Sequence, residues 1–175
     1  MHISFHHLFQ KLEKQRQEYV RLAKEFPNEA LQIAPRADSW STAQVLYHLE
    51  QVDAQVLKSI EKSLTIVQKL PSASLKTNFR SLLLNVFLRL PLKFKAPPVL
   101  GNMPSHVDLE EVLNSWETSR SRLKDLLDQF PPELMHKSMF RHPISGMLTM
   151  RQTLTFLHAH AAHHSKQFKA TLPTV

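Results

Sequence analysis

Glycine scarcity constrains the fold of this chain more than any other feature, because only Gly101 and Gly146 among its 175 residues are glycines. Tight β-hairpin turns need backbone positions with positive φ, which glycine adopts at the lowest steric cost. A chain built on hairpins would carry more glycine, so long helices joined by proline-marked connections are expected. The hydrophobic share of 42% and the charged share of 21% are typical of a globular chain. For this length we predict one domain, residues 1–175.

Four segments carry apolar residues at the spacing typical of one helix face. Two of them begin with capping boxes, Ser41 to Gln44 and Thr149 to Gln152, in which a hydroxyl and a glutamine side chain satisfy free backbone N–H groups. Between the second and third segments lies a long connection, inside which a short basic helix can form over residues 76–90. Four long helices with one long crossing connection predict an all-α, four-helix bundle. The four segments run over about residues 5–26, 41–70, 108–130 and 149–170.

Basic residues are concentrated in one stretch, residues 62–107, which holds seven basic residues and no acidic one. The other 15 basic residues balance the 15 acidic ones, so the net charge of +7 is a local feature. No nucleic-acid recognition motif accompanies it, and nucleic acid is not an expected partner. The leucine-rich part, residues 76–95, has the composition of a helix that lies on an anionic membrane. Folding over the bundle or packing in a homodimer is the simpler explanation, so we expect a homodimer and no membrane contact.

The chain shows no pattern of a signal peptide or of a transmembrane helix, and a cytoplasmic location is expected. Its longest apolar run, residues 82–90, is interrupted by Asn85 and Arg89 and is too short to cross a bilayer. The absence of cysteine excludes disulfides, zinc–thiolate sites and a cysteine nucleophile. Any metal site must therefore use imidazole, carboxylate and water ligands.

Histidine is frequent, with 11 residues, and two pairs are spaced by four residues. Roughly 0.6 such pairs are expected by chance at this frequency, so a pair alone is a weak signal. The His160/His164 pair lies on the predicted fourth helix, where residues four apart project to the same side. His48 lies beside the apolar stripe of the second helix. The three can form a three-imidazole metal site with open positions, or they can be core histidines bonded to neighbouring helices.

Three motifs occur in order along most of the chain. They are Ser39-Trp40-Ser41 with His48-Leu49, His142-Pro143 with Gly146-Met147-Leu148-Thr149, and His160-Ala-Ala-His-His-Ser-Lys-Gln167. Together they resemble the DinB-like superfamily of metal-binding four-helix bundles, which includes the bacillithiol transferases. The resemblance implies that the whole chain is one DinB-like domain and that a divalent metal is bound by His48, His160 and His164. His163 and His158 project away from the face of the pair and are not included.

The resemblance implies that the protein is a metal-dependent enzyme, first of all a transferase of a small thiol, with a small-molecule substrate. Zinc or nickel is the expected metal, with iron or manganese as alternatives, since imidazole suits all four. Ala161 stands where the HExxH motif of metalloproteases has its glutamate base, which argues against peptide hydrolysis. A metal-dependent hydrolase of a small substrate, or a non-enzymatic metal-stabilised interaction module, remains an alternative.

Several polar and aromatic residues near these motifs have no assigned role, and no catalytic side chain is predicted. Gln167, one turn after His164, either contacts a ligand or is an ordinary polar residue near a helix end. Trp40 and Trp116 are expected to be core aromatics. The acidic residues Glu50 and Asp53 are left out of the predicted site.

Overall fold

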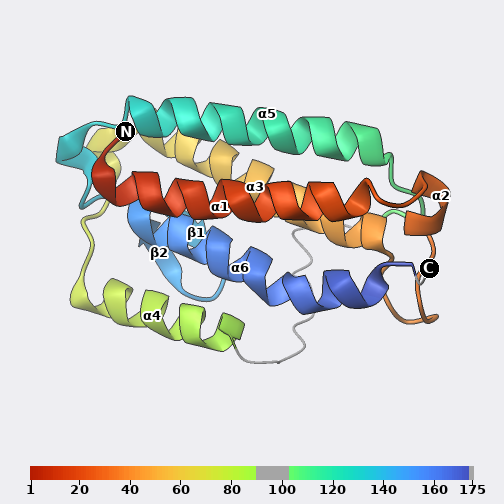
Figure 1. Cartoon of the computed structure of the whole chain (residues 1–175). Helices are drawn as coiled ribbons and strands as arrows, with labels where there is room; N and C mark the ends of the chain where they lie inside the picture. The colour runs from red at the N-terminus through yellow and green to blue at the C-terminus, as the bar shows by residue number, and fades with distance from the viewer. Residues whose placement is uncertain (90–102, 174–175) are drawn as a thin grey trace.

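The computed structural model describes residues 1–89 and 103–173, and it is mostly helical, as predicted (Figure 1). Short 3-10 turns, Val67–Lys69 and Pro132–Leu134, follow the second and third of the four long helices described below. The strands are β1 (Ser138–His142) and β2 (Gly146–Thr149). The helices are α1 (Ile3–Ala23), α2 (Asn28–Leu31), α3 (Thr42–Leu64), α4 (Leu75–Arg89), α5 (Leu109–Asp128) and α6 (Met150–Thr171).

Both predicted capping boxes are confirmed, and they fix the first turns of α3 and α6. At α3, the Ser41 hydroxyl accepts from the Gln44 backbone N–H at 3.2 Å, and the Gln44 side chain accepts from the Ser41 N–H at 2.9 Å. At α6, Thr149 and Gln152 form the same reciprocal pair at 3.4 and 2.9 Å. Each box satisfies N–H groups that a helix start leaves without an intrahelical partner. Because the first residue of each helix is fixed, the later residues that share one face of that helix are fixed as well.

The four long helices lie side by side, with α1 packed on α5 and α6, and α3 packed on the same two helices (Figure 1). Their apolar stripes meet in two hydrophobic clusters, one toward each end of the molecule. The largest fully buried side chains of the first cluster include Phe5, Leu12, Ile60, Leu127 and Leu148. Those of the second include Leu31, Leu46, Leu49, Trp116 and Phe168.

Two helices end earlier than the sequence pattern predicts, in each case ahead of a proline. Beyond α1, the backbone N–H of Phe26 bonds the carbonyl of Ala23 at 3.2 Å, which is the tighter spacing of a turn. Pro27 disfavours the α conformation at the residue before it, so the helix cannot continue. The α3 helix ends at Leu64 and passes through the turn at Val67–Lys69 before it reaches Pro71.

The connection over residues 131–148 contains a β-hairpin, which the all-α prediction missed. Strands β1 and β2 pair antiparallel, with His142 opposite Gly146. The turn needs one residue with positive φ, and Gly146 supplies it at a φ of 77°. The His142 ring completes the turn, because its Nδ1 accepts from the backbone N–H groups of Ile144 and Ser145, both at 3.2 Å. A single well-placed glycine therefore suffices for a hairpin in a chain that is otherwise helical.

The predicted short basic helix is present as α4, which packs on α6 and on β2 (Figure 1). Its last turn is fixed to α6 by the ring Nδ1 of His163, which donates to the carbonyl of Leu88 at 2.9 Å. Residues 90–102, with Lys93 and Lys95 of the basic stretch, lie outside the described residues. Among the helices that are described, none is long and apolar enough to span a bilayer.

Candidate metal centre

Helices α3 and α6 bring the three predicted ligand histidines together where they face each other. One ring nitrogen from each of His48, His160 and His164 lies within 4.8 Å of the other two. The Nε2 atoms of His48 and His160 are 3.2 Å apart, and the ring centroids of His160 and His164 are 4.7 Å apart. The four-residue spacing on α6 and the position of His48 seven residues past the Ser41 cap produce this convergence.

The separation of these nitrogens fits a shared metal ion. Bonds of about 2.0–2.1 Å from zinc to imidazole nitrogen, at tetrahedral angles, place two ligand nitrogens about 3.3 Å apart. The distance of 3.2 Å between the Nε2 atoms of His48 and His160 is close to this value. Without a cation between them, two lone pairs in that position would repel unless one ring carried a proton there. The donor set of three imidazoles therefore fits a divalent ion with further coordination positions left open.

Burial keeps all three rings in the neutral form that binds a metal. It lowers the pKa of His48 to about 3 and that of His164 to about 4, in both cases mainly because the charged ring is costly to desolvate. The pKa of His160 is also lowered well below its ordinary value, first by burial and then by the neighbouring rings. Neutral imidazole carries the free lone pair that coordinates a metal, so little binding energy is spent on removing protons at neutral pH.

Gln167 fixes the orientation of one candidate ligand, which resolves a point that the sequence left open. Its Oε1 accepts from Nδ1 of His164 at 2.8 Å. This bond places the ring proton on Nδ1 and leaves the Nε2 lone pair of His164 available to the cluster. Gln167 therefore acts on the site through His164.

We expect Gln167→Leu to weaken metal binding about 10- to 100-fold, the usual effect of removing the hydrogen-bond partner of a metal-bound histidine. The leucine keeps the apolar bulk of the side chain but cannot hold Nδ1–H. Competition with a chromophoric chelator measures the change. Gln167→Glu serves as the matched variant, because it keeps an acceptor at the same place and should retain tight binding. Equal affinities for the leucine variant and the unmodified protein would contradict the role given to Gln167.

Trp40 packs against the second hydrophobic cluster, in line with the prediction of a core aromatic, and it also borders the three imidazoles. Its ring is half-buried and lies 5.1 Å from the ring of His48 and 6.3 Å from that of His164, nearly parallel to the latter. Phe156 approaches the other side of the cluster, with its ring 5.7 Å from that of His160. These aromatic rings surround the imidazoles with apolar surface. The sequence signal was the position of Trp40 directly before the Ser41 cap of the helix that carries His48.

Glu50 and Asp53 of α3 turn away from the imidazoles and toward α5. Glu50 accepts from the Ser115 hydroxyl at 2.6 Å. Asp53 accepts from Arg120 at 2.5 Å and from the indole N–H of Trp116, which is buried as predicted. Among the described residues, no carboxylate belongs to the three-imidazole cluster. Leaving both acids out of the predicted site therefore agrees with their contacts.

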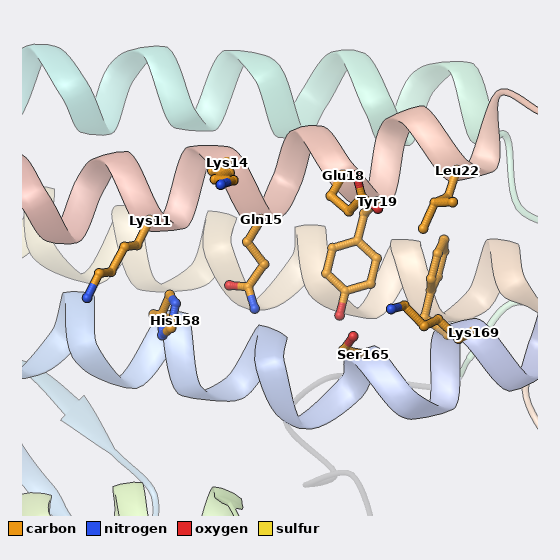
Figure 2. A pocket seen from close by; sticks show the side chains of 10 residues that line it. Lys11, Lys14, Gln15, Glu18, Tyr19, Leu22, His158, Ser165 and Lys169 are labelled. Atoms are coloured by element: carbon orange, nitrogen blue, oxygen red, sulfur yellow. The ribbon is translucent and has the colours of Figure 1, made fainter.

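The other histidines of this region have separate roles. His163 holds α4 through the Leu88 carbonyl, as described above. His158 lines a groove of about 430 Å³ between α1 and α6 (Figure 2). It comes two residues before His160, so helical geometry directs it to a different side of α6 from the cluster. His142 is buried within the hairpin, which lowers its pKa to about 4, and its Nδ1 is occupied by backbone N–H groups. The exclusion of His163 and His158 from the predicted ligand set is consistent with these positions.

The chain was compared with known protein families, curated proteins and solved structures. The family model of the DinB superfamily matches residues 11–168, a range that includes α3, α6 and all three clustered histidines. No curated protein and no solved structure matches the chain.

Proposed function

The chain belongs to the DinB superfamily, and from this premise we propose that it is a metal-dependent enzyme that transfers a small thiol to an electrophilic substrate. In this proposal His48, His160 and His164 hold one divalent ion, zinc or nickel first, and α1, α3, α5 and α6 constitute the family's four-helix bundle. The observation that carries the proposal is the convergence of three neutral imidazoles from two capped helices.

A divalent ion on three neutral ligands keeps its full charge, and it would lower the pKa of a thiol or a water that reaches an open position. In the transfer, the sulfur forms a bond to an electrophilic carbon, the bond to the leaving group breaks, and the thiol proton passes to solvent. His160 and His164 are half-buried, so small molecules can approach the cluster from outside. Trp40 offers an apolar wall along which an organic electrophile can pack.

Thiol transfer is favoured over hydrolysis by the residues that surround the cluster. Ala161 occupies the position of a protease base, and its carbonyl accepts from the buried Tyr19 hydroxyl at 2.6 Å, on the α1 side of α6. No carboxylate among the described residues joins the cluster to activate a water molecule. Thiolate formation needs no such base, because the proton can leave to solvent. A small-substrate hydrolase and a non-enzymatic interaction module stand as the alternatives.

We expect metal-dependent turnover of 1-chloro-2,4-dinitrobenzene with at least one of glutathione, bacillithiol and cysteine. The chelated protein and His48→Ala should both fall to the uncatalysed rate, because each lacks the complete metal site. Release of chloride and absorbance of the thioether product measure the reaction. Circular dichroism checks that His48→Ala keeps its helices, and metal analysis of protein purified without an affinity tag identifies the ion. Equal rates for loaded, chelated and variant protein would exclude a metal-dependent transferase.

A further inference from the structure

Helix α4 carries apolar side chains on two opposite faces. Its inner face buries Leu84 and Leu88, which are 6% and 9% exposed and pack in the core beside α6. Its outer face presents four large apolar side chains to solvent, at spacings of three and four residues that place them in one row along the helix. We call this row the outer stripe of α4: Phe79 (61% exposed), Leu82 (61%), Leu83 (39%) and Val86 (46%).

A continuous exposed apolar row of this kind is uncommon on a chain that works alone in water. Single exposed apolar residues are ordinary and need no explanation, whereas a contiguous patch marks a surface that meets another apolar phase or partner. All four residues fall within two turns of one helix, and the opposite face of that helix is already packed. The inner face already holds α4 on the rest of the protein, so the outer stripe is not needed for that contact.

Basic residues occupy helix positions on both sides of the outer stripe. At 3.6 residues per turn, Lys76 and Arg80 occupy helix positions along one edge of the stripe, and Arg89 occupies a position along the other. The Arg80 side chain is exposed. No acidic residue occurs anywhere in residues 62–107 to offset these charges. An apolar row between basic edges is the pattern of a helix that lies in the boundary between lipid headgroups and acyl chains.

We propose that α4 docks this protein on the surface of an anionic lipid bilayer. The outer stripe enters the boundary between headgroups and acyl chains, and the basic edges lie at the level of the lipid phosphates. This differs from the expectation of no membrane contact, which rested on the stretch folding over the bundle. The stretch does pack on the bundle through the inner face of α4, but that packing leaves four of its apolar side chains exposed.

Charge argues against a second copy of this chain as the occupant of the outer stripe. A two-fold symmetric contact would place the same basic helix on both sides of the interface. Arg80 and the flanking basic positions would then face like charges with no acid in the stretch to pair with them. An anionic surface is complementary to the same residues. A homodimer, which the sequence leads us to expect, would therefore use another face.

Docking through α4 would also position the proposed active site. The last turn of α4 is bonded to His163, the residue before the candidate ligand His164. The metal centre would thus lie close to the bilayer, where apolar electrophiles concentrate. This consequence rests on the proposed function, whereas lipid binding itself does not.

Flotation with phosphatidylcholine vesicles, with and without phosphatidylserine, tests the proposal. The unmodified protein should float with the vesicles that contain phosphatidylserine, and added salt should weaken the binding. Arg80→Gln should lower the vesicle affinity about fivefold, the usual effect of one basic residue near an anionic surface. Leu82→Asn combined with Val86→Asn should lower it more than tenfold by removing apolar contact. The matched controls Lys58→Gln and Ile33→Asn, exposed residues outside α4, should bind as the unmodified protein does.

A site-specific probe provides a second measurement, because the chain contains no cysteine. Leu82→Cys labelled with an environment-sensitive fluorophore should shift to the blue on anionic vesicles, while labelled Ile33→Cys should not. Absence of flotation of the unmodified protein would overturn the proposal. So would a stripe variant that changes the oligomeric state by sedimentation but not the lipid affinity, since the occupant would then be a second copy. Neither measurement depends on turnover, so failure here is distinguishable from failure of the proposed transferase activity.

Discussion

Replacing His160 with alanine should reduce the affinity of the protein for zinc or nickel by more than about 100-fold. This exceeds the loss of about 10- to 100-fold that is usual when a residue hydrogen-bonded to a metal ligand is removed. His160 contacts both of the other rings: its Nε2 is 3.2 Å from that of His48, and its ring centroid is 4.7 Å from that of His164. Two remaining imidazoles hold an ion much more weakly than three. Chelator competition gives the affinity, and circular dichroism should show that α6 remains helical.

His158→Ala is the matched control for this variant, because it removes an imidazole from the same helix on the side of the α1–α6 groove (Figure 2). It should leave metal affinity unchanged. Wild-type affinity in His160→Ala would show that the metal centre is assigned wrongly. Because burial lowers the pKa of His48 to about 3 and of His164 to about 4, protons should compete with the metal only well below the ordinary histidine pKa.

Local rules predict on which helix each of the three histidines lies and which of them share a helix face. A capping box sets the first residue of each helix, and helical spacing then determines which later residues share a face. His160 and His164 share a face on any α-helix. Local rules do not show that His48 of α3 faces this pair. That prediction came from the resemblance to the DinB-like superfamily.

The features that the sequence did not predict depend on contacts between distant segments or on one special residue. Trp40 precedes its helix, so no periodicity indicates which way its ring turns. The hairpin depends on Gly146 and on the His142 ring that closes its turn, and a general argument from glycine scarcity could not anticipate either. The exposure of the outer stripe of α4 depends on which of two apolar faces packs on α6.

The buried pair between Asp53 and Arg120 is a further feature that the sequence could not predict. Its members lie 67 residues apart, on α3 and α5, and each has the appearance of an ordinary surface charge. In the structure Asp53 is 9% exposed and Arg120 is 3% exposed. Burial raises the pKa of the Asp53 carboxyl, and the Arg120 guanidinium opposes that shift. The two charges therefore depend on each other inside the protein.

Asp53→Ala should lower the free energy of unfolding by about 3–5 kcal/mol, the usual cost of leaving one member of a buried ion pair alone. The variant would remove the acceptor of both Arg120 and the Trp116 indole N–H. The Nε and Nη1 atoms of Arg120 are buried without hydrogen-bond partners, so among the described residues the hydrogen bond to Asp53 is the one that the guanidinium would lose without replacement. Urea unfolding followed by circular dichroism measures the loss.

Arg120→Met, made alone and in the Asp53→Ala background, separates the cost of an isolated charge from the value of the pair. The double variant should be more stable than Asp53→Ala alone, because it removes a guanidinium that has lost its counter-ion and replaces it with an apolar side chain. A strong non-additive term would show that the two residues act as one unit. If the two losses simply added, the Asp53 carboxylate would not be what compensates the buried Arg120, and its effect on stability would have to come from the Trp116 hydrogen bond or from packing. The metal affinity should stay unchanged in all three variants, since the pair joins α3 to α5 and neither residue belongs to the imidazole cluster.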